Sequence, residues 1–138
     1  MSFLLDTCII SELRKPNSDD GVLAWFEMCA EDMLYLSTVT LGELHYGIEL
    51  LPKSRRKIEL LTWYKHVCLS YSGHILDVTL PVLERWGSLR AARQKSGVPL
   101  AMGDGLIAAT AIVNGMTVVT RNTSDFRGMG VDLINPWS

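Results

Sequence analysis

The chain has 138 residues, of which 48% are hydrophobic and 20% are charged. This is the composition of a folded globular protein, and it excludes a disordered or fibrous chain. The length is that of one core of ordinary size, so we expect residues 1–138 to form a single domain. The net charge of −2 excludes a broadly basic surface for nucleic acid but leaves local contacts open.

Features of membrane or exported proteins are missing from the sequence. The start, MSFLLD, has neither the basic segment nor the long apolar segment of a signal peptide. The longest apolar stretch, residues 106–113, is too short to span a bilayer. Three cysteines, Cys8, Cys29 and Cys68, are odd in number and far apart, which favours buried thiols over disulfides or a zinc site. We therefore expect a cytoplasmic protein that does not contact membranes.

Strand-like and helix-like segments alternate along the chain. A helix-like sequence begins directly after the first strand-like run, and longer segments with helical spacing separate the later runs. Five runs are predicted as strands: 3–5, 34–37, 74–78, 116–120 and 131–134. Five longer segments are predicted as helices: 19–30, 38–51, 54–69, 80–95 and 103–115. This order predicts an α/β fold, a three-layer α/β/α arrangement with a central parallel sheet.

Acidic or amide side chains occur where the predicted strands end or a helix begins. They are Asp6, Glu43, Asp104, Asn122 and Asp125. Each has an ordinary explanation by itself: a solvated helix edge for Glu43, a helix cap of about 1 kcal/mol for Asp104, and a polar turn for the last two. Together they point to one place, because open α/β sheets bind ligands beyond the carboxyl ends of their strands.

The proposed cluster consists of oxygen donors without a partnering His or Cys. Crowded carboxylates repel one another unless a cation offsets their charge. Oxygen donors suit a hard ion, Mg²⁺ or Mn²⁺, which binds phosphate oxygens and activates water. Gly103 and Gly105, which flank Asp104, allow another group to approach closely. The cluster therefore predicts hydrolysis of a phosphodiester.

Four blocks of the sequence, with the closing INPW at 134–137, resemble the signatures of PIN-domain ribonucleases. They are LLDTCIISE (4–12), TLGELHYGI (40–48), GDGLIAATA (103–111) and VVTRNTSDF (118–126). The resemblance covers the whole chain. It is greatest to the VapC toxins of toxin–antitoxin pairs, and within them to the FitB-like branch.

The resemblance implies a Mg²⁺-dependent endoribonuclease that is selective for single-stranded RNA. Activated water attacks phosphorus in line and leaves a 5′-phosphate and a 3′-hydroxyl. The metal-binding acids are then Asp6, Glu43 and Asp104, with either Asp125 or Asn122 completing the catalytic site. Small hydroxyl residues of the family match Thr7 and Thr120, which line the site and orient water. The family's usual Asn is replaced here by Cys8.

The resemblance also implies partners for the chain. It implies a homodimer, inhibited by a cognate antitoxin of the VapB or FitA kind whose tail enters the acidic cleft. DNA binding then belongs to the antitoxin, in agreement with the net charge of −2. Positive charge gathers at 53–57 and around Arg93, and ordinary solvated helix faces explain both. We hypothesise that Arg55, Arg56 or Arg121 guides the RNA backbone.

Two other classes of protein fit parts of the sequence. The first is an inactive binding module with the same fold, disabled by Cys8 or Asn122. The second is a receiver domain phosphorylated on Asp77, although the sequence lacks the acidic pair near its first strand and the Lys after its last. A phosphatase with Asp-x-Asp after the first strand fits much less well than a PIN-domain ribonuclease, because Cys8 occupies the second acidic position.

Overall fold

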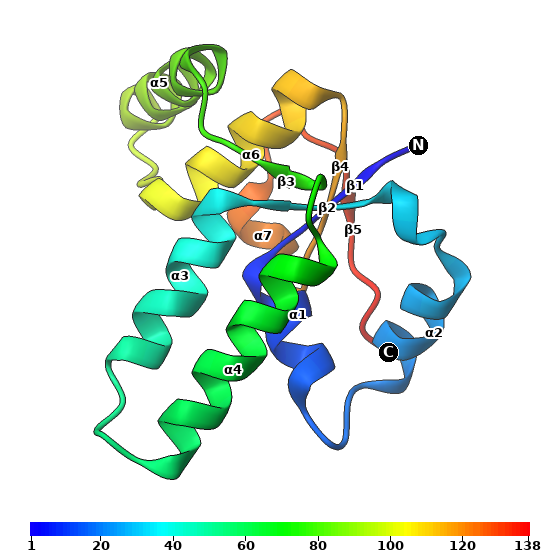
Figure 1. Ribbon diagram of the computed structural model, residues 1–138. Coiled ribbons are helices and arrows are strands. Elements are labelled where there is room, and N and C mark those ends of the chain that lie inside the picture. The colour runs from blue at the N-terminus through cyan, green and yellow to red at the C-terminus, as the bar shows by residue number, and fades with distance from the viewer.

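A computed structural model describes all residues, 1–138, and shows a five-stranded sheet with helices around it (Figure 1). The strands are β1 (Phe3–Leu5), β2 (Leu34–Ser37), β3 (Ile75–Leu76), β4 (Thr117–Val119) and β5 (Leu133–Ile134). The helices are α1 (Thr7–Arg14), α2 (Asp20–Met28), α3 (Thr38–Glu49), α4 (Arg55–Ser70), α5 (Leu80–Lys95), α6 (Met102–Asn114) and α7 (Thr123–Phe126), with a 3₁₀ turn at Glu31–Met33.

All neighbouring strands are parallel, in the order β3-β2-β1-β4-β5. The chain builds outward from β1 through β2 to β3, and then returns to the other side of β1 for β4 and β5. The strand order therefore reverses between β1 and β4, which is where sheets of this kind bind ligands. The residues that follow these two strands, Asp6 and Thr120, lie at that point.

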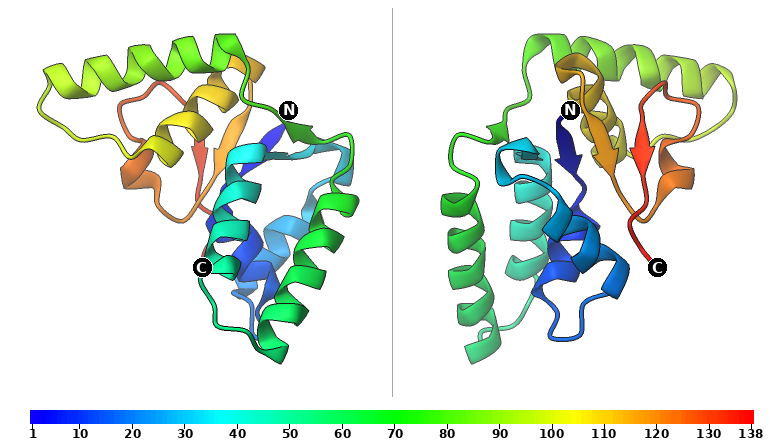
Figure 2. Two further views of the ribbon diagram at one scale, coloured as in Figure 1. Left: turned by 60° about the vertical axis from the view of Figure 1, so that its left-hand side comes forward. Right: turned by 90° about the vertical axis from the view of Figure 1, so that its right-hand side faces the viewer.

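The alternation of side chains along β1 divides the core into two parts, one on each face of the sheet. Phe3 and Leu5 pack with apolar residues of α1, α3 and α4, and α2 adds partly buried rings. On the other face, Leu4 packs against α6 and the buried Phe126 of α7. Figure 2 shows helices on both sides of the strands. The predicted three-layer parallel fold is confirmed.

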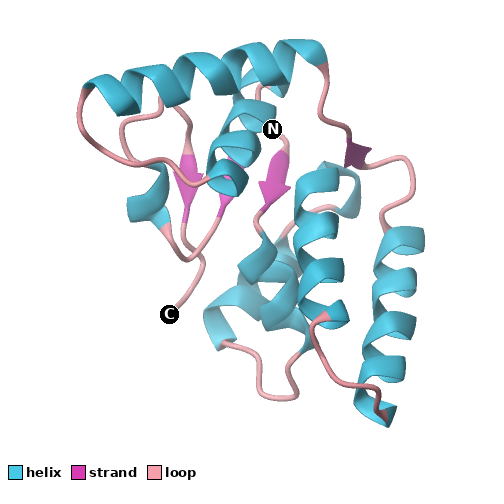
Figure 3. Cartoon of the chain, turned by 90° about the vertical axis from the view of Figure 1, so that its left-hand side faces the viewer, coloured by secondary structure: helices cyan, strands magenta, loops and turns pink.

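Helices α3 and α4 form a hairpin that extends past the carboxyl edge of the sheet (Figures 1 and 3). The side chain of Ser37, at the end of β2, caps α3 by accepting a hydrogen bond from Val39 N. The helix therefore begins at the sheet edge and carries Glu43 beside it. No helix has both the length and the apolar character needed to cross a membrane.

Two local predictions differ from the structure. The strands predicted at 74–78 and 131–134 are each reduced to two residues, because both lie at the edges of the sheet. The polar segment 122–125, predicted as a turn, instead supplies the N-cap residue and the first three residues of the one-turn helix α7. Phe126 is 1% exposed and anchors this helix against the sheet, a contact that polar turn composition does not indicate.

Candidate active site at the carboxyl edge of the sheet

Asp6 is a buried carboxylate held by both of the central strands. Its backbone N–H donates to Val119 O at the end of β4, and its side chain caps α1 by accepting from Thr7 N at 2.8 Å. Its other oxygen, Oδ2, accepts a 2.8 Å hydrogen bond from the Oγ1 atom of Thr120. With 7% exposure, this carboxylate is oriented by hydrogen bonds on both oxygens. The predicted position of Asp6 at the rim is what the structure shows.

Glu43 reaches the site from α3 and is solvent-exposed. Thr7 Oγ1 donates to Glu43 Oε1 at 2.8 Å, which links α3 to the start of α1. Gly103 lies on the other side of this carboxylate: a Cβ atom built on Gly103 would be 2.9 Å from Glu43 Oε2. The absence of a side chain at Gly103 therefore leaves room for Glu43 beside α6, as the sequence predicted for a close approach.

Asp104 is the third residue of α6 and does not cap it. Ala101 is the N-cap residue, and no side chain makes a capping hydrogen bond there. The ordinary explanation of Asp104 as a helix cap is therefore wrong. The next residue, Gly105, packs closely against Trp86: a Cβ atom built on Gly105 would be 2.8 Å from Cδ1 of Trp86.

The other three acids act on the ionisation of Asp104. The pKa of Asp104 is raised to about 6, mainly by burial and in smaller part by nearby negative charges. These charges belong to Asp6, Asp125 and Glu43, in order of decreasing effect, while Arg93 acts in the opposite direction. The acid that follows β1 and the acids on α3 and α7 thus lie near enough to Asp104 on α6 to disfavour its charged form.

Asp125 and Asn122 occupy different kinds of position in the fourth block. Asp125 lies in α7 and, with Asp104, lines a hollow of about 510 Å³. Asn122 acts through its backbone: its N–H donates to Thr120 Oγ1 at 3.0 Å, and its carbonyl accepts from Asp125 N. Its side chain makes no hydrogen bond that caps α7. Only Asp125 adds a carboxylate to the hollow beside Asp104.

Cys8, in the first turn of α1, lies beside the carboxyl ends of β1 and β4, at a position where the resembling family usually has Asn. Its Sγ atom donates to Asp6 Oδ2 at 3.7 Å and accepts from Arg121 N at 3.5 Å. Thr120 Oγ1 lies 3.6 Å from the same sulfur. Burial is the main cause of a raised pKa of the Cys8 thiol, which is therefore neutral near pH 7. Cys8 joins Asp6 to the segment after β4 through weak hydrogen bonds.

The donor chemistry of the site fits a hard cation, although the side chains do not close around one point. Carboxylate oxygens are the donors that Mg²⁺ prefers, and a cation would offset the neighbouring negative charges that, after burial, raise the pKa of Asp104. No group of three His, Cys, Asp or Glu side chains is close enough together to hold an ion as placed. Asp6 and Glu43 instead accept hydrogen bonds from the threonines.

A groove of about 320 Å³ continues from the acids between α1, α3 and α4. Thr7 and Glu43 line it together with Arg56, one of the predicted RNA contacts. Sequence reasoning missed Arg14, which lines the same groove with its guanidinium 5.8 Å from the ring centroid of Trp63. Arg14 lies two residues after the end of the first sequence block, and no regular spacing in the sequence connects it to Arg56.

The other two predicted arginines differ in their surroundings. Arg121 directly follows Thr120, and its guanidinium lies 5.5 Å from the ring centroid of Trp137. Arg55 forms an exposed ion pair with Glu59 one turn along α4, at 3.4 Å. Arg121 therefore lies at the carboxyl edge of the sheet. Arg55 lies on a solvent-exposed face of α4, as expected for a run of charged residues on a helix.

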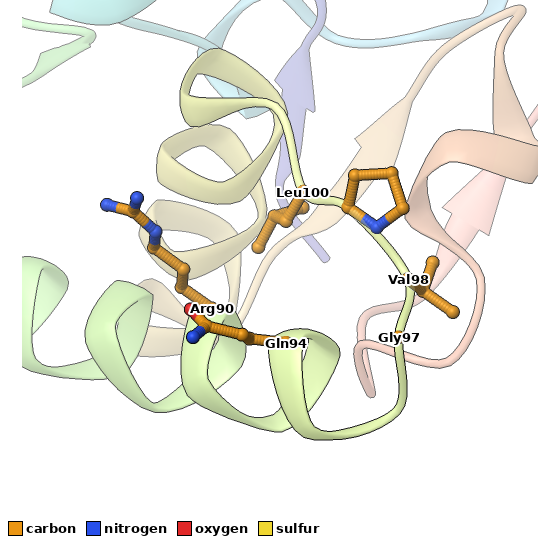
Figure 4. A pocket seen from close by; sticks show the side chains of 6 residues that line it. Arg90, Gln94, Gly97, Val98 and Leu100 are labelled. Carbon is orange, nitrogen blue, oxygen red and sulfur yellow. The ribbon is translucent and has the colours of Figure 1, made fainter.

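A separate hollow of about 420 Å³ lies at the turn between α5 and α6 (Figure 4). It is lined by Arg90, Gln94, Gly97, Val98, Pro99 and Leu100. None of these residues is acidic, and Figure 4 shows Arg90 extending away from Val98. This hollow therefore does not contain the acidic cluster.

Comparison with known families identifies the class of protein. A family described as the PIN domain matches residues 3–131, which is most of the chain. The chain therefore belongs to the PIN-domain family. The alternative of a receiver domain is wrong, and Asp77 is an exposed residue that follows the edge strand β3.

Relatives of known name place the chain among the VapC-type toxins of this family. It is 38% identical to VapC ribonuclease Y4jK of Sinorhizobium fredii over 97% of this chain and 96% of the relative. It is 36% identical to Toxin FitB of Neisseria gonorrhoeae over 97% of both chains. The solved structure of FitAB bound to the IR36 DNA fragment superposes with a TM-score of 0.89 at 35% identity, covering 99% of this chain and 96% of that one.

Proposed function

We propose that this protein is a Mg²⁺-dependent endoribonuclease, the toxin of a type II toxin–antitoxin pair. The observation that carries the proposal is the convergence of Asp6, Glu43, Asp104 and Asp125 on one edge of the sheet. The name of the relative Y4jK, a VapC ribonuclease, supports RNA as the substrate. The relative FitB is named a toxin, which supports the biological role.

Three acids hold the ion in this proposal, and a fourth completes the set. Asp6, Glu43 and Asp104 are the metal ligands, and Asp125 is preferred to Asn122 because it lines the hollow beside Asp104. Mg²⁺, or Mn²⁺ in its place, polarises the phosphate and lowers the pKa of water when it is bound.

The residues around these acids orient them and bind the substrate. Thr120 and Thr7 fix the carboxylates of Asp6 and Glu43 by 2.8 Å hydrogen bonds. Fixed ligands lose less freedom when an ion and substrate bind. Arg56 provides positive charge at the groove beside Glu43, where an RNA phosphate binds in this proposal.

The proposed partners follow from the surface and the relatives. Apolar Leu44, Ile48 and Leu51 line the groove that leads to Glu43, which suits a segment of a cognate antitoxin. FitAB is a complex bound to DNA, so DNA contact is assigned to the antitoxin and not to this acidic chain. Exposed large side chains at α3, α5 and α6 support a homodimer: Tyr46, Leu50 (the residue after α3), Leu80 and Met102. Three free thiols agree with a cytoplasmic location.

The proposal is tested by cleavage of single-stranded RNA with purified protein, with Mg²⁺ and with EDTA. Asp6→Ala and Asp104→Ala should each abolish cleavage, and EDTA should do the same. Asp77→Ala is the matched control, because this exposed acid lies after an edge strand. Cleavage that persists in both site variants would remove the carboxylates from the mechanism.

A second candidate function is an inactive binding module of the same fold. Two observations favour it: Cys8 replaces the family's usual Asn, and the acids do not close around one point. This candidate predicts tight binding to the antitoxin without RNA cleavage at any Mg²⁺ concentration.

A further inference from the structure

Arg93 connects the last turn of α5 to the short helix that carries Asp125. Its Nη2 atom donates to the carbonyl oxygen of Arg127 at 2.8 Å and to that of Asp125 at 3.4 Å. Its Nη1 atom donates to the carbonyl of Pro99 at 3.4 Å. The side chain therefore ties together three segments: the end of α5, the loop before α6, and the end of α7. Arg93 is half-buried, so the prediction of a solvated helix face is wrong here.

Helix α7 depends on such external contacts. It has four residues, and a single helical turn is not stable without tertiary packing. Phe126 anchors it on the sheet side. Arg93 holds the opposite, carbonyl end, where a positive charge also interacts favourably with the helix dipole.

We propose that Arg93 is a positioning residue that holds Asp125 beside Asp104 in the metal-binding site. The inference rests on the proposed function and adds a residue to it. Arg93, Asp104 and Asp125 line one hollow, so a shift of α7 changes the separation of the two acids directly. Direct binding of RNA by Arg93 is disfavoured, because both terminal nitrogens already donate to backbone carbonyls.

The first test needs neither metal nor RNA. Hydrogen exchange is measured at the amides of Asp125 and Met129, which donate within α7 and just after it. Arg93→Ala should accelerate exchange at both amides in the metal-free protein. Arg90→Ala is the matched control. Arg90 is one turn earlier on α5, and its guanidinium lies over the ring of Trp86 and not against α7. Unchanged exchange in Arg93→Ala would overturn the proposal.

The second test is a double-mutant cycle on Mg²⁺ affinity, measured by calorimetry. Arg93→Ala should weaken Mg²⁺ binding by about tenfold, as is typical of residues that orient a ligand. In an Asp125→Ala background the same change should have an effect of about twofold or less, because Arg93 acts through Asp125. Arg93→Lys, which keeps the charge, should restore part of the affinity.

Three outcomes of the cycle would contradict the inference. They are equal effects of Arg93→Ala in the two backgrounds, no effect of Asp125→Ala alone, and no rescue by Lys. Failure of the proposed function gives a different result, since the wild-type protein would then bind no Mg²⁺ at all.

Discussion

The Oγ1 atom of Thr120 donates a 2.8 Å hydrogen bond to Asp6 Oδ2, joining the ends of the two central strands. Both residues are buried, and Asn122 N donates to the same hydroxyl. One hydroxyl therefore sets the orientation of the first acid and the path of the chain after β4. This arrangement explains why a charged side chain is tolerated at the end of the first core strand.

Replacing Thr120 with Val removes the hydroxyl while keeping the side-chain shape. Asp6 Oδ2 and Asn122 N then lose a partner, which should lower the free energy of unfolding by about 1–3 kcal/mol. RNA cleavage should fall by about 10–100-fold, as for other residues that orient metal ligands. Thr120→Ser restores the hydroxyl and should restore activity. Full activity in the Val variant would show that this hydrogen bond is dispensable.

Gly103→Ala should impair activity without loss of stability. The new Cβ would be 2.9 Å from Glu43 Oε2, and the flexible end of Glu43 has to move. Alanine favours a helix more than glycine by up to about 1 kcal/mol, so the melting temperature should not fall. A displaced carboxylate should reduce cleavage by about tenfold or more. The control is Gly42→Ala on α3, where a Cβ meets nothing within 4 Å. Equal activity of the two variants would contradict the role of Gly103.

Asp104 should make the metal-free protein less stable as the pH rises from about 4 to about 6. The pKa of Asp104 is raised from 3.8 to about 6, so the native state binds more protons than the unfolded state in this window. The free energy of unfolding therefore falls with rising pH and stays low above pH 6.

Asp104→Asn removes the charge and tests whether ionisation of Asp104 destabilises the native state. At pH 7 the metal-free variant should be more stable than the wild type by about 1 kcal/mol, a value reduced for solvent screening because Asp104 is only half-buried. This corresponds to a rise in Tm of about 2–4 °C. The difference should disappear at pH 4. Thermal unfolding of both proteins at pH 7 and pH 4 measures this difference. If Asp104→Asn were less stable than the wild type at pH 7, the predicted direction of the effect would be wrong.

Cys8→Ala should affect packing more than metal binding. Arg121 N loses its acceptor, which should lower the free energy of unfolding by about 1 kcal/mol. Mg²⁺ affinity should change by about twofold or less, because a thiol is a poor donor for this ion. Cys8→Ser, with a hydroxyl in the same place, should restore stability. A large loss of Mg²⁺ affinity in the Ala variant would instead make the sulfur part of the metal site.

Much of the fold could be predicted because it depends on local patterns. Alternating strand-like and helix-like segments gave the parallel sheet, and positions directly after strands placed Asp6 and Thr120 at one edge. The expectation of a single domain, the metal and the catalytic roles stay predictions.

Other features depend on contacts between distant segments and leave no local pattern. The hydrogen bond between Thr7 and Glu43 joins residues 36 positions apart, and that between Arg93 and Arg127 joins residues 34 apart. Helix α7 forms because Phe126 is buried, although its polar sequence reads as a turn. The sequence and its family resemblance could name the acids and the two threonines beside them, but not the hydrogen bonds that join these residues across the fold.

The metal assignment can be tested by locating a Mn²⁺ ion in crystals of the protein by anomalous scattering. We expect one or more peaks bounded by the carboxylates of Asp6, Glu43, Asp104 and Asp125, and their loss in Asp104→Asn. A protein saturated with Mn²⁺ that shows no peak among these four acids would contradict the assignment.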